Sequence, residues 1–262
     1  MAQPTLVLVH GSWHCPEHFE LLIPALSHHG YKIATASLPS TQSMDLPPRD
    51  LFDDTAAVRD AVLTELSRGN DVVVVAHSYG GCVTNNALEG LNRRARTAAG
   101  HKSAVTAIVF LCAAPLPAGT TFLAALGGKP HPVHDFSKSK DFVEVGPPGP
   151  GYYFCNDLTP EASEKYSAML RPQAWVVSGQ TTKYTAYVDI PSWYLFTEKD
   201  QVLPPPAQRG IVQAAESQGV KLKTASLESS HSPFLSMPEE TTDFIVQAAK
   251  ESALLATTVS CP

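Results

Sequence analysis

Short runs of apolar and β-branched residues recur along the chain, and longer amphipathic segments separate them. Six runs predict strands, at residues 5–10, 32–37, 71–77, 104–111, 190–197 and 220–227. The first and third are apolar at nearly every position, which is typical of strands covered by helices on both faces. Helices are predicted at residues 17–28, 50–68, 80–91, 204–217 and 238–255. The alternation predicts an α/β fold in which helices flank a mostly parallel central sheet.

The alternation breaks between residues 115 and 189. Proline and glycine are dense there, as in the loop Gly146-Pro147-Pro148-Gly149-Pro150-Gly151, and ten aromatic residues fall in the same stretch. Such punctuation predicts short elements and loops. An irregular aromatic segment suits a cap over an apolar pocket, and the alternative is a loop-rich part of the same core. We therefore expect a core in two parts, residues 1–114 and 190–262, with a cap insertion at residues 115–189.

Net charge, hydropathy and cysteine content indicate which kinds of partner and which cellular compartment to expect. The net charge is −6, and the only basic cluster, Arg93, Arg94 and Arg96, reads as the solvated end of a helix, which argues against a nucleic-acid partner. No apolar run approaches the roughly 20 residues that a membrane-spanning helix needs, and the N-terminus lacks the pattern of a signal peptide. Five scattered cysteines predict buried free thiols in a reducing cytoplasm rather than disulfides or a zinc site. The oligomeric state is not predicted.

The strongest chemical signal is the stretch VVVVAHSYGG, residues 72–81. A buried strand runs into Ser78 and then into small residues that open a helix, which is the pattern of a nucleophile elbow with an exposed serine hydroxyl. Ala76 stands where the first glycine of the usual GxSxG motif would be. Gly80 and Gly81 would let the helix approach the strand closely. The alternative is an ordinary strand–turn–helix with a capping serine.

Candidates for a base and an acid follow the last two predicted strands. His231 is expected to accept the serine proton, because the chain order Ser…Asp…His is the one used with such elbows. His77 is its nearest rival, but it adjoins Ser78, and side-chain alternation would turn it to the opposite face. Asp200 is expected to orient the histidine and stabilise its protonated form, with Glu198 as the alternative.

The first strand ends in His10-Gly11-Ser12-Trp13. Backbone N–H groups of Ser12 and Tyr79 are expected to form an oxyanion hole for a tetrahedral intermediate. His10 is expected to brace the loop rather than act as a base. Four aromatic residues are expected to line a substrate pocket, with ordinary core packing as the alternative: Trp13, Phe122, Phe154 and Tyr187.

Signals for metals and cofactors are weak. His131-x-x-His134 could ligate a metal, but no third ligand is evident. No GxGxxG motif follows the first strand and no Walker-type phosphate loop occurs. Cys82, just after the elbow, is expected to be a small packed residue. The sequence therefore predicts neither a metal nor an organic cofactor.

Taken together, these motifs resemble the α/β-hydrolase superfamily. The chain is most similar to the branch of small methylesterases, hydroxynitrile lyases and microbial relatives of the salicylate-esterase type. The resemblance spans nearly the whole chain, through LVLVHGSWHCPEHF, VVVVAHSYGG, YFCNDLTPEASEKYSAMLRPQA, IPSWYLFTEKDQVLP and SSHSPFLSMPEE. The Asn156-Asp157-Leu158 stretch resembles microbial, especially fungal, relatives.

The resemblance implies a nucleophile at Ser78, an acid at Asp200, a base at His231 and oxyanion donors at Ser12 and Tyr79. Plant lyases of this branch carry a lysine directly after the catalytic histidine. This chain has Ser232 there, which disfavours cyanohydrin cleavage.

We therefore expect a serine hydrolase that cleaves an ester or lactone of a small, largely apolar or aromatic compound through an acyl-enzyme. Because one scaffold can support several chemistries, two alternatives stay open. One is a lyase or cyclase-type biosynthetic enzyme that uses the same side chains as acid–base groups. The other, less favoured, is a ligand-binding protein of the receptor kind.

Overall fold

A computed structural model describes residues 3–258 and contains a central sheet of six parallel strands in the order β2-β1-β3-β4-β8-β9. The strands are β1 (Thr5–Val9), β2 (Ile33–Ala36), β3 (Val72–His77), β4 (Val105–Leu111), β8 (Ser192–Thr197) and β9 (Lys223–Leu227). The predicted α/β class and parallel sheet are confirmed. The central strands β1, β3, β4 and β8 are buried along their whole length, whereas β9 is a largely exposed edge strand.

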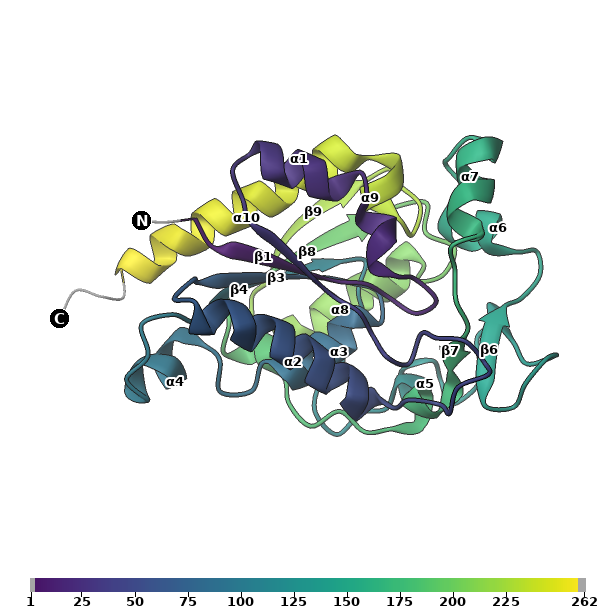
Figure 1. The fold of residues 1–262 in the computed structure, drawn as a ribbon, viewed down its shortest axis with the longest axis horizontal. Coiled ribbons are helices and arrows are strands. Elements are labelled where there is room, and N and C mark those ends of the chain that lie inside the picture. Colours follow the sequence, from purple (N-terminus) through teal and green to yellow (C-terminus); the bar gives the residue numbers. More distant parts are fainter. Residues whose placement is uncertain (1–2, 259–262) are drawn as a thin grey trace.

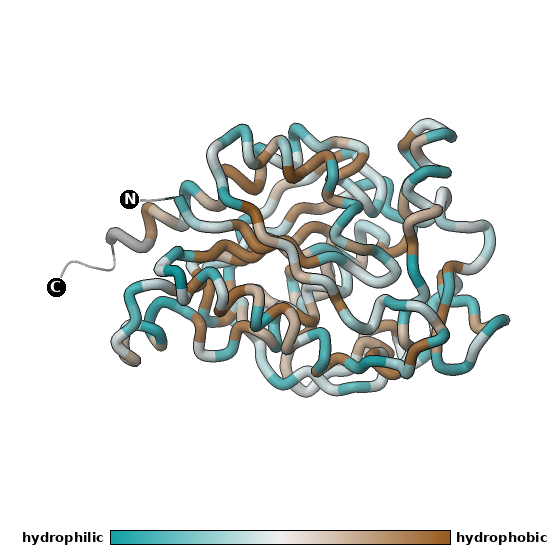
Figure 2. The backbone as a smooth tube through the Cα atoms, viewed as in Figure 1, coloured by the Kyte–Doolittle hydropathy of each residue, from teal (hydrophilic) through white to brown (hydrophobic). Residues whose placement is uncertain are grey.

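Helices cover both faces of the sheet (Figure 1). Helices α1 (Leu22–His28) and α10 (Pro238–Thr258) lie on one face, and α2 (Leu51–Ser67), α3 (Gly80–Ala87) and α8 (Pro205–Ser217) lie on the other. Strand β1 shows why both layers form, since its alternate side chains enter different apolar clusters. The most hydrophobic segments accordingly run through the centre of the molecule (Figure 2).

Helix α2 begins with a capping box. The Asp50 side chain accepts from the backbone N–H groups of Phe52 and Asp53, and the Asp53 side chain accepts from the N–H of Asp50. These bonds satisfy amides that have no partner inside the helix. Val58 and Val62, on the apolar stripe of this helix, are fully buried against the sheet.

Two predicted helices differ from the structure. The stretch 17–28 is not one helix but the 3-10 helix η1 (Pro16–Phe19) followed by α1. Pro24 explains the break, because proline inside a continuous helix would lose a hydrogen bond and clash with the preceding turn, whereas it is tolerated in the first turn of α1. The helix predicted at residues 80–91 ends earlier, at Ala87, and the arginine cluster lies in a separate helix, α4 (Arg93–Ala98), which is capped by the Asn92 side chain.

Residues 112–191, between β4 and β8, form the segment that we call the insertion. It consists of short pieces, as its prolines and glycines predict. A small antiparallel sheet contains β5 (His134–Asp135), β6 (Phe142–Val145) and β7 (Gln173–Ala174). The helical pieces are α5 (Phe122–Ala125), α6 (Pro150–Phe154), α7 (Pro160–Ser167), η2 (Trp175–Gly179) and η3 (Ala186–Val188). The part that holds β6, β7, α6 and α7 lies beyond the carboxyl ends of the strands, whereas η3 packs against α3 (Figure 1).

Two further expectations concern the whole chain. Four of the five cysteines, Cys15, Cys82, Cys112 and Cys155, are free and buried, whereas Cys261 lies outside the described residues. Within residues 3–258, no helix combines the length and the apolar character needed to cross a bilayer.

Candidate active site

Backbone strain gathers at the carboxyl ends of the central strands. Among residues 3–258, three residues other than glycine have positive φ angles: Trp13 at 62°, Ser78 at 53° and Cys112 at 36°. They follow β1, β3 and β4, which are neighbours in the sheet. Such angles are costly for residues with side chains and cluster at functional sites. The chain leaves β1 for β2 on one side and returns to β3 on the other, and open α/β sheets bind ligands at the strand ends beside such a switch point.

Ser78 is held in its strained turn by hydrogen bonds of its own backbone. Its N–H donates to the Leu111 carbonyl at 3.2 Å, and its carbonyl accepts from the N–H groups of Gly81 and Ala114, each at 3.0 Å. The Ser78 side chain is partly exposed while its neighbours in the chain are buried. The turn therefore presents the hydroxyl at the edge of the sheet, as an elbow requires.

Three glycines give the elbow its room. A Cβ on Gly80 would lie 2.6 Å from the carbonyl oxygen of His10, and one on Gly81 would lie 2.9 Å from the Cβ of Ala113. A Cβ on Gly11 would lie 2.6 Å from the Cβ of Ser78 itself. The close approach of helix α3 to the strands therefore requires glycine at positions 80 and 81.

The structure brings Ser78, His231 and Asp200 into one hydrogen-bonded chain. The His231 Nε2 lies 2.9 Å from the Ser78 Oγ, and the His231 Nδ1 lies 2.7 Å from the Asp200 Oδ2. His231 and Asp200 are 1% and 2% exposed, so bulk water hardly reaches their bond. Each ring nitrogen thus faces one partner, the arrangement needed to pass a proton from serine to histidine.

Asp200 is fixed by more than the histidine. Its Oδ1 accepts two backbone N–H groups at 2.8 Å, and its Oδ2 accepts two side-chain donors besides His231. The additional donors are Val202, Leu203, Thr197 and Gln208. Gln208 comes from helix α8, and nothing in the sequence marks it, because the packing of α8 over the loop decides which residue reaches the carboxylate.

Glu198, the alternative acid, lies elsewhere. Its Oε1 accepts from the Arg209 Nη2 at 2.7 Å, in an ion pair that is partly exposed to solvent. The Arg209 guanidinium holds the pKa of the Glu198 carboxyl below its usual range. The geometry therefore favours Asp200 as the partner of His231.

His77 lies closer to the site than side-chain alternation predicts, since its ring centroid is 4.8 Å from that of His231. Its Nε2 donates to the backbone carbonyl of His231 at 2.8 Å, and the Cys112 Sγ donates to the same oxygen at 3.3 Å. Burial lowers the pKa of His77 well below its ordinary value. His77 therefore holds the backbone of His231 instead of competing for the serine proton.

The same three side chains come nearest to a metal-binding set among the described residues. The ligand atoms of His77, Cys112 and His231 lie within 4.8 Å of one another. Burial raises the pKa of the Cys112 thiol well above its ordinary value, so the thiolate that a metal needs is disfavoured. The set is better explained by the two bonds to the His231 carbonyl.

The loop after β1 is braced by histidines. His10 accepts from the Leu38 N–H at Nε2, at 3.0 Å, so its Nδ1 carries the proton that is donated to the Gly11 carbonyl at 2.9 Å. Burial lowers the pKa of His10 to about 4, and the ring is neutral at pH 7. Because a trans peptide is planar, fixing the Gly11 carbonyl aims the Ser12 N–H in the opposite direction. The His14 Nδ1 holds the Ser12 carbonyl at 2.8 Å in turn.

The two expected oxyanion donors remain available. Within residues 3–258, neither the Ser12 N–H nor the Tyr79 N–H donates to a carbonyl or side-chain acceptor. Ser12 is 8% exposed, and Tyr79 follows Ser78 directly at the start of α3. Free amides at such an edge can bind a developing negative charge.

A buried polar network that the sequence does not predict lies behind the elbow. The Tyr79 hydroxyl donates to the Asp54 Oδ2 at 2.8 Å, and Asp54 also accepts from the Ser40 N–H and hydroxyl at 2.9 and 2.5 Å. Ser40 accepts from the Gln173 Nε2 of strand β7 at 2.6 Å. Burial raises the pKa of Asp54 to about 6. The sequence does hold one signal, since Asp54 falls on the apolar stripe of α2, three residues after Leu51.

The predicted pocket residues lie in different surroundings. Trp13 is 4% exposed, donates its Nε1–H to the Val143 carbonyl at 3.0 Å and packs against Phe154 at 5.7 Å between ring centroids. The Phe154 ring lies 5.8 Å from that of His231. Phe122 meets Tyr79 edge-on at 5.8 Å, whereas Tyr187 is buried in the apolar cluster on the α2–α3 side of the sheet. Trp13 and Phe154 thus adjoin the candidate site, and Phe122 borders it through Tyr79.

The His131-x-x-His134 pair does not converge on a metal. The His134 Nδ1 bonds the His131 carbonyl at 3.0 Å, and the His134 ring packs between Trp13 at 5.4 Å and Trp175 at 5.0 Å. Burial lowers the pKa of His134 to about 4.

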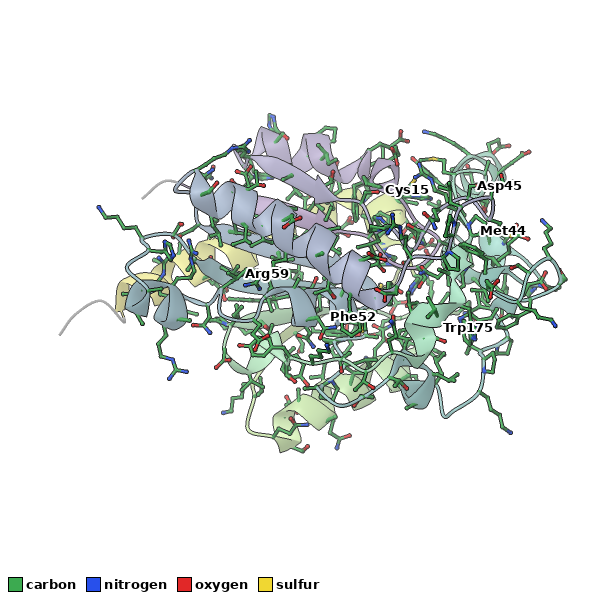
Figure 3. All side chains as sticks on the ribbon, turned by 60° about the horizontal axis from the view of Figure 1, so that its bottom comes forward. Cys15, Met44, Asp45, Phe52, Arg59 and Trp175 are labelled. Carbon is green, nitrogen blue, oxygen red and sulfur yellow. The ribbon has the colours of Figure 1, made fainter. Side chains whose placement is uncertain are left out.

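Trp175 lies at the insertion end of the molecule, as do Met44 and Asp45 (Figure 3). A cavity of about 260 Å³ at this end is lined by Trp13 and insertion residues.

Comparison with known proteins agrees with the fold. The model of the Alpha/beta hydrolase family matches residues 6–244. A curated relative, the probable hydrolase R7 of Phoma sp. (strain ATCC 20986 / MF5453), is 30% identical over 251 residues, covering 95% of this chain and 99% of its own. The alpha/beta hydrolase nvfD of Aspergillus novofumigatus (strain IBT 16806) is 27% identical over 254 residues, covering 96% and 99%.

Solved structures share the fold at lower identity. A pyrethroid hydrolase from Sphingobium faniae JZ-2 superposes with a TM-score of 0.70 at 21% identity and covers 94% of this chain and 97% of its own. The methylesterase MES16 from Arabidopsis gives a TM-score of 0.72 at 19% identity, with coverages of 94% and 99%. The family model matches most of the sequence, and the hydrogen-bonded Ser78, His231 and Asp200 lie within the matched residues. This protein belongs to the alpha/beta hydrolase family.

Proposed function

We propose that the protein is a serine hydrolase that cleaves an ester or lactone of a small, largely apolar or aromatic compound. The observation that carries the proposal is the chain from Ser78 through His231 to Asp200, built on a serine with φ of 53°. An ordinary capping serine would need neither the strained angle nor the buried carboxylate behind the histidine.

Each residue has a role in this reaction. His231 accepts the Ser78 proton as the oxygen attacks the carbonyl carbon, and Asp200 stabilises the imidazolium that forms. The N–H groups of Ser12 and Tyr79 bind the oxyanion. The protonated His231 then gives its proton to the leaving oxygen, and water activated by the neutral histidine hydrolyses the acyl-enzyme.

The substrate class follows from the surroundings. Trp13 and Phe154 lie beside the site, so an aromatic or apolar group can pack there, and we propose that residues 115–189 act as the cap over it. Phe122 and Tyr187 are proposed as further wall residues. The structural neighbours include a polyneuridine aldehyde esterase besides the pyrethroid hydrolase and the methylesterase, so small esters suit proteins of this fold. The buried free cysteines suit the cytoplasm.

Covalent labelling tests the proposal. A fluorophosphonate probe is expected to modify the protein at Ser78, as located by mass spectrometry, and to leave Ser78→Ala unmodified. A panel of p-nitrophenyl acetate, butyrate and benzoate, together with aromatic lactones, then measures hydrolysis. An unlabelled but folded wild-type protein would overturn the proposal. Labelling without hydrolysis of esters or aromatic lactones would favour the lyase or cyclase alternative.

A further inference from the structure

The loop that carries His231 is attached to the insertion. The residue before it, Ser230, donates its backbone N–H to the Asp157 Oδ2 at 2.7 Å and its hydroxyl to the Phe154 carbonyl at 2.9 Å. The Phe154 ring also packs against the His231 ring. Three contacts from the insertion therefore meet one short stretch of the loop, between β9 and α9 (Pro233–Ser236), where the backbone has no regular structure.

The loop that carries Asp200 is attached to the same part of the insertion. The Asn156 Nδ2 donates to the Lys199 carbonyl at 3.1 Å, and the Tyr152 hydroxyl donates to the Gln201 Oε1 at 3.0 Å. These bonds fall on the residues immediately before and after Asp200. The two loops also contact each other, because the Lys199 N–H donates to the Ser229 carbonyl at 3.0 Å.

We propose that residues 152–157 form a clamp that positions His231 and Asp200, with Asp157 as its main positioning residue. The inference rests on the proposed hydrolase function. The Asp157 bond fixes the Ser229–Ser230 peptide, and the bond of the Ser230 hydroxyl to the Phe154 carbonyl fixes the same residue. The backbone directly before His231 is therefore held in place, and its direction sets where the imidazole points. The insertion would thereby complete the acid–base half of the site as well as cover it.

The chemistry of Asp157 argues for this role over simple stabilisation. Its Oδ1 is buried and has no hydrogen-bond partner among the described residues. An unsatisfied buried oxygen costs stability. A residue selected only to hold the insertion down would be better as a neutral or fully paired side chain, whereas a carboxylate gives the Ser230 N–H a strong, short bond.

The test compares Asp157→Ala with Asp157→Asn, which keeps a carbonyl oxygen for the Ser230 N–H. Glu161→Ala is the matched control, an exposed acidic residue on α7 of the same insertion. The measurements are the fluorophosphonate labelling rate of Ser78 and the kcat and KM for p-nitrophenyl butyrate, each across pH 5–9. Thermal unfolding reports whether each variant is folded.

We expect Asp157→Ala to lower the labelling rate and kcat by about 10- to 100-fold with a small change in KM, since misplacement of a reacting group by about 1 Å costs up to that much. The acid limb of the pH–rate profile of Asp157→Ala moves to lower pH, because a looser bond between His231 and Asp200 stabilises the imidazolium less. Asp157→Asn, which keeps an acceptor oxygen but not the charge, is expected to fall between Asp157→Ala and wild type, and Glu161→Ala stays near wild type.

Two results would overturn the clamp. One is a folded Asp157→Ala protein with wild-type rates and an unmoved acid limb, whatever its melting temperature. If Asp157→Ala does not fold, Asn156→Ala decides the matter: a slower rate with the same shift of the acid limb supports the clamp, and unchanged rates refute it. Failure of the wild-type protein to label would instead remove the hydrolase proposal on which the clamp depends.

Discussion

Replacing Asp200 by asparagine is the most informative single perturbation of the site. The Oδ1 position keeps its two backbone N–H donors, but an NH₂ group replaces the oxygen that accepts from His231. The new amide donates, so the His231 Nδ1 must offer a lone pair and its proton must move to Nε2. There it faces the Ser78 Oγ, 2.9 Å away, and His231 can no longer accept the serine proton.

The size of the loss follows from that tautomer change. In serine–histidine–aspartate sites it lowers kcat by about 10⁴-fold, which is ~5 kcal/mol of transition-state stabilisation. KM is expected to change little, because Asp200 is 2% exposed and lies behind the histidine. The Gln208 Nε2, which also donates to the lost oxygen at 3.1 Å, would face a second donor and add to the disturbance.

The assay is hydrolysis of p-nitrophenyl butyrate together with the rate of fluorophosphonate labelling at pH 8. Glu198→Gln is the control, since Glu198 pairs with Arg209 and not with His231. We expect that variant to keep its rate within about threefold, as surface substitutions usually do. A greater loss in Glu198→Gln than in Asp200→Asn would refute the assignment of the acid.

Two other predictions concern the elbow. Gly11→Ala places a Cβ 2.6 Å from that of Ser78, and labelling is expected to slow at least ~100-fold, as read by gel fluorescence with the exposed Gly210→Ala in α8 as control. The control should gain about 0.5–1 kcal/mol of stability, and normal labelling of Gly11→Ala would contradict the packing argument. The raised pKa of Asp54, about 6 in the folded protein against about 3.9 ordinarily, means that the fold binds this proton more tightly than the unfolded chain does. Stability is therefore lost as pH rises from about 4 through 6, and Asp54→Asn should remove a loss of ~3 kcal/mol, measured by urea denaturation at pH 4 and 7. An equal pH dependence in both proteins would show that Asp54 is not the group responsible.

The pattern of apolar and polar residues predicts a strand or helix well where the sequence of that element alone decides its contact with the core. The stretch 72–81 indicates both a buried strand and the turn after it, and this pattern is enough to identify Ser78 as the candidate nucleophile. Its partners are also within reach of sequence reasoning, because chain order and strand ends place His231 and Asp200 near the same edge.

Contacts made across the molecule are not predictable in this way. Gln208 and Asp157 reach the site only because α8 and the insertion pack where they do. The Asn156-Asp157-Leu158 stretch resembles fungal relatives, but nothing in it indicates a contact with the loop that carries His231. His77 shows the same limit, since strand alternation gives the direction of a side chain but not the position of the loop that comes to meet it.

The two halves of the site are held by different parts of the structure, and this affects how freely each half can change in sequence. Ser78 is held by central strands and by glycines that tolerate no added methyl group, so that half leaves evolution little freedom. Asp200 follows β8 and His231 follows the edge strand β9. Side-chain bonds from the insertion reach the residues beside them, Lys199 and Ser230, and these bonds can be exchanged one at a time. In the proposed hydrolase, a change in the insertion would therefore reach the proposed acid–base pair, while the proposed nucleophile keeps its place.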